Sequence, residues 1–154
     1  MTAKQHFSTV LNDMEGIVFQ HPYHAFVLLA IMIEVLGKCL SSALWQQKGQ
    51  SHKDFNRAIN KYASLKKYDT VPNMYYSLRC GLAHVLLIKN GIILAPERND
   101  LSQNIIGCKD LYRDLCQAWN DIITGVIKTA KNLDEEILPI HDGVSGTTKT
   151  IVYS

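Results

Sequence analysis

The stretch "YHAFVLLAIMIEVLGKCLSSALW", residues 23–45, decides the fold. It is almost continuously apolar and far longer than a typical strand, so we predict a buried central helix from Tyr23 to about Trp45. Its longest uninterrupted apolar run, Ala25 to Ile33, falls short of the roughly 20 residues that cross a bilayer. We therefore expect the core helix of one globular domain and no membrane span.

Helical periodicity continues on both sides of this stretch. Apolar residues at spacings of three and four predict a helix over residues 4–19, a third helix from Ser51 or His52 through Leu65, a fourth that carries "YYSLRCGLAH", and a last long helix from about 109 to 133. Pro22 and Pro72 suit first helical turns. The sequence predicts a mainly α fold, a bundle of four to five helices that forms a single domain over residues 1–154.

A small β element is expected beside the bundle. The period changes in "HVLLIKNGIILAP", residues 84–96, where two β-branched runs flank an Asn-Gly pair, which is a strong hairpin signal. The tail "GVSGTTKTIVYS", residues 143–154, alternates like a strand. We predict a small antiparallel hairpin or sheet formed by residues of about 85–94 and 144–153.

The composition is that of a soluble globular protein, with 154 residues, 47% of them hydrophobic, and a mean hydropathy of −0.04. The first residues lack a basic segment followed by an apolar one, so we expect no signal peptide. The four cysteines are widely spaced without a Cys-x-x-Cys pair, which favours reduced thiols. These features together predict a cytoplasmic protein.

Basic charge is concentrated in one segment. The net charge of the chain is only +2, but residues 48–79 hold seven basic and two acidic residues, a net charge of +5. One interpretation is attraction of phosphate groups. The other is a solvated helix face, since Lys53, Arg57 and Lys61 recur every four residues.

Arg79, Cys80 and His84 stand together inside an apolar run. Cys80 and His84 are four residues apart and would share a helix face, as two metal ligands or a thiolate and its base would. A metal site needs further ligands, and the candidates, His21 and His24, lie far away in the sequence. No third group orients the cysteine either. We therefore predict no metal and no cofactor, and read Cys80 as a small hydrophobe.

Arg79 and His84 are the stronger pair. On an α-helix, five residues separate side chains by roughly 140° and about 7.5 Å, so a long arginine and the histidine can both reach one phosphate. Arginine stabilises a phosphate and histidine moves a proton near neutral pH, which is what metal-free RNA cleavage requires. The alternative is structural: Arg79 pairs with a carboxylate in the bundle and His84 caps the helix.

Glu34 lies in the middle of the central helix and needs a partner. An unpaired buried carboxylate costs several kcal/mol, so we expect an ion pair, with Arg79 as the first choice and Arg57 as the second. In a functional interpretation Glu34 orients Arg79 in an active groove. In a structural interpretation the pair only holds two helices together.

The motif "YYSLRCGLAH" resembles that of the HEPN superfamily, in which an arginine is followed after four to six residues by a histidine near the end of a bundle helix. The "RCGLAH" itself is similar to a group of small bacterial proteins, and the resemblance covers roughly residues 23–90. It implies a metal-independent ribonuclease or RNA-binding fold, often a homodimer whose motifs face each other, and a possible protein antitoxin.

By this resemblance, Arg79 would hold the phosphate and His84 would act as acid or base, with Glu34, Cys80 and Arg57 in support. One position departs from the pattern. The residue after the arginine is usually polar in active members, and here it is Cys80. Three hypotheses stay open: a ribonuclease, a non-catalytic module that binds RNA, a nucleotide or a protein, and a structural bundle.

Overall fold

A computed structural model describes residues 1–82 and 91–136. Its α-helices are α1 (Ala3–Gln20), α2 (Pro22–Cys39), α3 (Ser51–Lys61) and α5 (Cys108–Ile123), joined by the 3₁₀ turns η1 (Lys66–Thr70) and η3 (Leu101–Gln103) and by the π-helix η2 (Tyr75–Leu82). Two short strands, β1 (Ile93–Ala95) and β2 (Ile105–Gly107), complete the described part. The predicted mainly helical bundle is confirmed.

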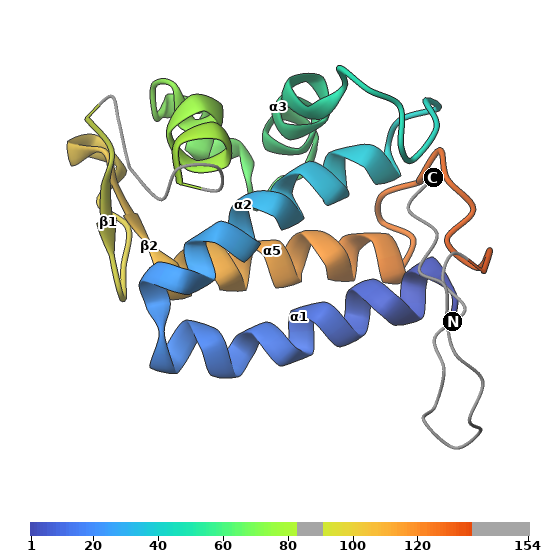
Figure 1. The fold of residues 1–154 in the computed structure, drawn as a ribbon, viewed down its shortest axis with the longest axis horizontal. Helices are drawn as coiled ribbons and strands as arrows, with labels where there is room; N and C mark the ends of the chain where they lie inside the picture. The colour runs from blue at the N-terminus through green and yellow to red at the C-terminus, as the bar shows by residue number, and fades with distance from the viewer. Residues whose placement is uncertain (83–90, 137–154) are drawn as a thin grey trace.

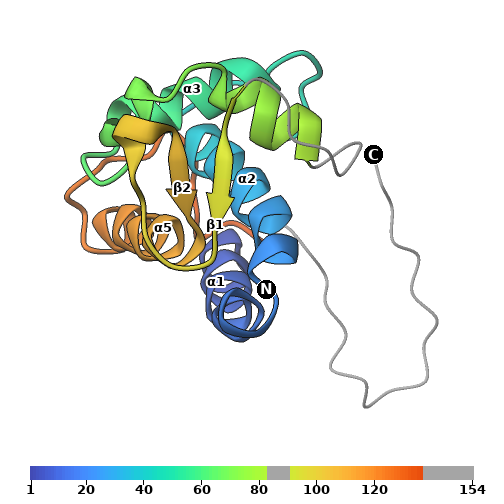
Figure 2. The same cartoon turned by 90° about the vertical axis from the view of Figure 1, so that its left-hand side faces the viewer.

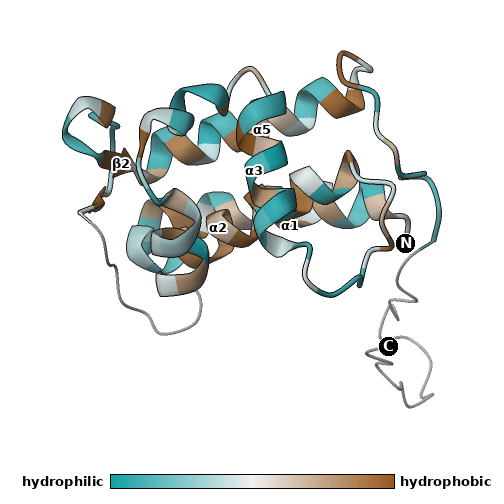
Figure 3. Ribbon diagram, turned by 90° about the horizontal axis from the view of Figure 1, so that it is seen from above, coloured by the Kyte–Doolittle hydropathy of each residue, from teal (hydrophilic) through white to brown (hydrophobic). Residues whose placement is uncertain are grey.

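Helix α2 lies at the centre of the fold. Helices α1 and α5 run beside it, α3 and η2 cover its other side, and the strands sit at one end of the bundle (Figures 1 and 2). Hydrophobic residues are concentrated on α2 and hydrophilic residues on α3 (Figure 3). Ten residues of α2 are buried, including Glu34. The predicted central helix is therefore the core of the bundle.

By length and apolar composition α2 could also cross a membrane, and within residues 1–82 and 91–136 no other helix could. More than half of that stretch is buried inside the bundle, which suits the core helix of a soluble protein.

Three helices end earlier than their apolar stripes predict. Helix α2 ends at Cys39 and not near Trp45, because the N–H groups of Leu40 and Ser41 bond back to the carbonyls of Gly37 and Lys38. Helix α3 ends at Lys61 and not at Leu65. Its C-cap, Tyr62, is extended, and the Tyr62 hydroxyl donates to the α2 carbonyl of Leu36 at 2.9 Å. Tyr62 and Leu65 still belong to the core, so periodicity identified buried residues beyond the helix.

The last helix, expected to reach residue 133, ends at Ile123. Gly125 adopts φ +77°, a left-handed conformation that stops a helix, and the chain then turns back. Ala130 N–H donates to the Cys39 carbonyl at 3.0 Å, and Lys4 N–H donates to the Leu133 carbonyl at 2.9 Å. Residues 124–136 therefore close one end of the bundle with irregular structure.

The predicted antiparallel hairpin is wrong in the described part, where β1 pairs in parallel with β2, in the register Ile93 with Ile105 and Ala95 with Gly107. Between them the chain reverses a second time, since Asp100 and Ile105 form an antiparallel bridge around Asn104, which has φ +56°. The Asn99 side chain fixes this loop by accepting from Gly107 N–H at 2.8 Å. The expected strands at 85–90 and 144–153 lie outside the described residues.

All four cysteines are free thiols, as predicted. Burial raises the pKa of Cys39 and of Cys108 to about 12, so both stay protonated at neutral pH. Cys80 and Cys116 are half-buried.

Candidate functional site

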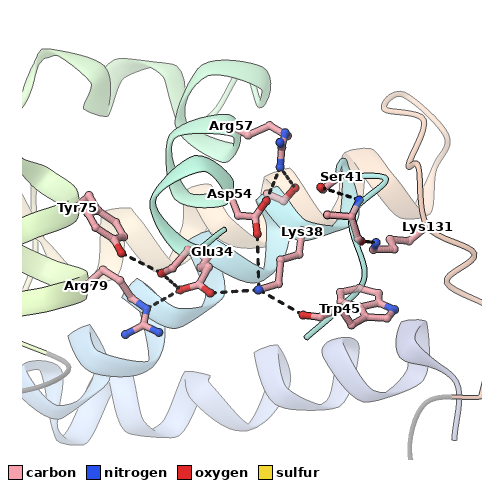
Figure 4. Close-up of polar contacts among 12 residues, drawn as sticks. Glu34, Lys38, Ser41, Trp45, Asp54, Arg57, Tyr75, Arg79 and Lys131 are labelled. Atoms are coloured by element: carbon pink, nitrogen blue, oxygen red, sulfur yellow. Dashed lines mark hydrogen bonds and ion pairs between the residues drawn. The ribbon is translucent and has the colours of Figure 1, made fainter. Parts of the chain in front are cut away.

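The Glu34 carboxylate is the centre of a polar cluster between α2, α3 and η2 (Figure 4). Its Oε2 accepts from Arg79 Nε at 2.6 Å and from Ser51 Oγ at 2.7 Å, and its Oε1 lies 3.4 Å from Lys38 Nζ. The side chain is only 9% exposed. The predicted ion pair between Glu34 and Arg79 is confirmed, and it joins residues 45 positions apart in the sequence.

Lys38 extends the cluster toward α3. Its ammonium lies 3.6 Å from Asp54 Oδ2 as well as beside Glu34, and it donates to the Trp45 carbonyl at 3.4 Å. Asp54 is almost fully buried and pairs with Arg57, whose guanidinium also donates to the Gly37 carbonyl. Arg57, expected as the second partner of Glu34, pairs with Asp54 instead. Three cations and two carboxylates leave the network with a net charge of +1.

Gly37 permits this close approach of α2 and α3. A Cβ atom at residue 37 would lie 1.7 Å from the Asp54 carbonyl oxygen, far inside van der Waals contact. Only glycine therefore lets the first turn of α3 lie against α2. That contact brings Ser51 and Asp54 within reach of Glu34 and Lys38.

The network lowers the pKa of Glu34. Burial by itself raises it, but the hydrogen bonds from Ser51 and Arg79, with the charges of Arg79 and Lys38, more than offset that effect. Glu34 is therefore ionised at neutral pH and holds Arg79 by a charge-assisted hydrogen bond.

Arg79 lies on a π-helix, a geometry that is rare in proteins and frequent at functional sites. The arginine side chain is 19% exposed, and the two terminal nitrogens of its guanidinium point away from Glu34 (Figure 4). Glu34 holds one edge of the Arg79 guanidinium, and η2 places Arg79 at the margin of the bundle. Arg79 is thus a positioned arginine and not a freely rotating one.

Tyr75 and Cys80 belong to the same helix and lie one π-turn apart. The Tyr75 hydroxyl donates to Ser51 Oγ at 3.1 Å, and Ser51 in turn donates to Glu34. Burial raises the pKa of Tyr75; the hydrogen bond with Ser51 lowers it, whereas the one with Cys80 raises it further. Tyr75 is therefore protonated at neutral pH, and the half-buried Cys80 contacts it.

The structure thus gathers Glu34, Arg79 and, through Lys38 and Asp54, Arg57 into one network, with Cys80 next to Tyr75. His84 lies outside the described residues. His21 and His24 approach each other at the start of α2, with ring centroids 5.8 Å apart, but no group of metal-binding side chains forms within residues 1–82 and 91–136.

Four members of the network were not expected from the sequence to join Glu34: Lys38, Ser51, Asp54 and Tyr75. Two of them carried a usable signal. Lys38 follows Glu34 by four residues on one helix, and Asp54 precedes Arg57 by three, which are the spacings of helical ion pairs. Nothing in the local sequence of Ser51 or Tyr75 indicates that they meet Glu34.

The interpretation of the basic segment as a solvated helix face is confirmed in part, and attraction of phosphate groups stays a prediction. Lys53, Lys61 and Lys66 are exposed on α3 and η1, as a solvated face requires. Arg57 and Arg79 are instead committed to buried carboxylates, and Lys67 pairs with Asp114 at 2.8 Å. The exposed lysines of α3 lie on the helix that also supplies Ser51 to the network.

Comparison of the chain with protein-family models, with curated proteins and with solved structures finds no match.

Proposed function

We propose that this chain is an RNA-binding domain that contacts the phosphodiester backbone through Arg79. The observation that carries the proposal is the orientation of Arg79 by a buried, ionised carboxylate, at 2.6 Å, while part of the side chain reaches solvent. A preoriented guanidinium loses little side-chain entropy when it binds a phosphate. The HEPN-like motif around Arg79 supports RNA as the ligand.

Charge supports the same proposal. The network that holds Arg79 has a net charge of +1, and exposed Lys53 and Lys61 lie on α3, which borders it. Such a surface attracts a phosphate backbone in a salt-dependent manner. The HEPN-like interpretation therefore rests on the motif, the positioned arginine and the basic α3.

The second candidate function is metal-independent cleavage of the bound RNA, with Arg79 stabilising the pentacoordinate phosphate and His84 transferring a proton. The π-geometry of the helix that carries Arg79 favours it, because such helices concentrate at functional sites. In this reaction a base removes the proton of the 2′-hydroxyl, the 2′-oxygen attacks the phosphorus, and the 5′-oxygen leaves with a proton from an acid.

Binding is tested by fluorescence anisotropy with a labelled single-stranded RNA at several salt concentrations. Arg79→Gln should weaken binding about tenfold or more and flatten the salt dependence, because one phosphate contact is lost. Arg113→Gln is the matched control, since Arg113 is an exposed arginine on α5. If both variants lose the same amount of RNA affinity, Arg79 makes no specific contact with RNA and is a structural residue.

Cleavage is tested by incubating the same RNA with the protein in a chelator. We expect cutting by the wild type and none by His84→Ala. A strand with 2′-deoxyribose at every position should bind but stay intact, because it lacks the nucleophile. Binding without cleavage would leave a non-catalytic RNA-binding module, and cleavage by His84→Ala at the wild-type rate would remove His84 from the mechanism.

The resemblance also predicts a homodimer and a possible antitoxin. Exposed apolar side chains on α2, namely Tyr23, Leu28 and Ile31, support the homodimer. Tyr23 and Leu28, together with Leu82 of η2, also border a hollow of about 430 Å³. A second copy seated there would lie next to the helix that carries Arg79. The antitoxin stays a prediction from the motif.

A further inference from the structure

A second feature lies between α3 and η2, on the other side of Tyr75 from Glu34. Three aromatic rings cluster there: His52 stacks on Tyr75 with centroids 4.5 Å apart and planes at 26°, and Tyr76 contacts both at 5.2 Å. Unlike core aromatics, Tyr76 is 52% exposed, and His52 is exposed as well. Exposed aromatic faces at one place are a common feature of single-stranded nucleic acid sites.

These rings border a pocket of about 270 Å³. Its floor is apolar, formed by buried side chains that include Phe55 and Met74. Its rim is polar and exposed, with the amides of Asn56 and Asn73 and the carboxylate of Asp69. A nucleobase has the matching character, since its faces are apolar and its edge carries hydrogen-bond donors and acceptors.

The pocket is connected to Arg79. Tyr75, which forms one wall, donates to Ser51, and Ser51 donates to the carboxylate that holds Arg79. Tyr75 and Arg79 are four residues apart on η2, about one helical turn. One strand can therefore place a phosphate at Arg79 and an adjacent base in the pocket.

We propose that the pocket between α3 and η2 holds an unpaired nucleobase of the bound RNA, stacked against Tyr76 and His52. This inference rests on the proposed function and deepens it, because it assigns a site for the base beside the site for the phosphate. We expect the ligand to be single-stranded, because a paired base would have to be unpaired and unstacked before it enters the pocket, which costs a few kcal/mol.

The test compares two labelled strands of equal length in an anisotropy titration: a single-stranded RNA and an abasic strand that keeps ribose and phosphate. The wild type should bind the RNA more tightly. Tyr76→Ala should weaken RNA binding roughly tenfold and leave abasic binding unchanged, since stacking of a base on an aromatic ring has about this effect. Tyr76→Trp should restore the discrimination.

Phe19→Ala is the matched control, because Phe19 is comparably exposed but lies on α1, outside both the pocket and the proposed dimer face. Circular dichroism and the thermal midpoint establish that each variant is folded. RNA affinity that is the same in Tyr76→Ala and Phe19→Ala would overturn the pocket while leaving the phosphate contact intact. A wild type that binds neither strand would overturn the proposed function and the pocket with it.

Discussion

The two buried faces of α2 are held in different ways. Leu29 and Ile33 are fully buried and lie one turn apart, so they share an apolar face about 140° around the helix from Glu34 and Lys38. Helices α1 and α5 run beside α2 (Figure 1). The face toward α3 and η2 carries Glu34 and Lys38 in a network of ion pairs. Burial of apolar surface away from water stabilises the packing on the first face. The packing on the second face is stable only while each buried charge keeps its partner. The polar face therefore specifies which elements may approach α2, and the apolar face contributes most of the stability.

The largest effect is expected where the polar face tolerates no added volume. Gly37→Ala should destabilise the fold by more than about 4 kcal/mol or prevent folding, because the new Cβ would overlap the Asp54 carbonyl. Gly16→Ala is the matched control, since Gly16 lies on α1 with open space around it and should gain about 0.5–1 kcal/mol. Urea unfolding of both variants measures the difference. Equal stability would mean that α3 does not lie against α2 as described.

The second prediction compares the two faces directly. Arg79→Gln should destabilise by about 2 kcal/mol, because Glu34 loses one partner but keeps Ser51 and Lys38. Leu29→Ala, on the apolar face, should cost about 3 kcal/mol through the cavity that it leaves. The double variant Glu34→Gln with Arg79→Gln should recover part of the loss, whereas no substitution at Glu34 should rescue Leu29→Ala. Unfolding midpoints in urea are measured for the wild type, for each single variant at residues 29, 34 and 79, and for the two double variants that carry Glu34→Gln. Additive losses in Glu34→Gln with Arg79→Gln would contradict the coupling.

The sequence predicts the features of α2 that repeat along one helix, but it does not predict contacts between elements that are far apart in the chain. The apolar face repeats along one helix, so the sequence of residues 23–45 reveals it, including the need of Glu34 for a partner. Arg79 could be named because a buried carboxylate restricts the choice to a few cations. Ser51 and Tyr75 could not, because their contacts depend on how α3 and η2 pack on α2. The parallel strand pair was missed for a similar reason, since a second chain reversal at Asn104 leaves little signal.

The third prediction uses pH to isolate the polar face. Glu34 has a folded pKa below its ordinary value, so its contribution is complete above the unfolded pKa of about 4.5 and is lost as the pH falls through the folded pKa. Glu34→Gln should therefore be less stable than the wild type by about 1 to 2 kcal/mol at pH 7. The gap should shrink below pH 4.5. Thermal unfolding of both proteins from pH 7 to pH 3 measures this difference in stability. Glu15 is an exposed carboxylate on α1, so the control variant Glu15→Gln should change stability by less than about 0.5 kcal/mol at pH 7. A gap that is constant with pH would mean that Glu34 is not ionised in the network.

The smallest effect on stability is expected on the third, outward face of α2, where Ile31 is exposed and makes little contribution to the core. Ile31→Lys should change the unfolding free energy of a monomer by less than about 0.5 kcal/mol. If the proposed homodimer forms through this face, a buried lysine at the interface would be desolvated without a partner, so the same substitution should convert a dimer into a monomer. Light scattering after size-exclusion chromatography measures the mass, with Lys128→Ile, a substitution at an exposed position beyond α5, as the control. Two results would contradict this prediction: a wild type that is monomeric at high concentration, and a dimer that Ile31→Lys leaves intact. Either would show that α2 does not form the interface and that its apolar outer face is only the exposed side of a core helix.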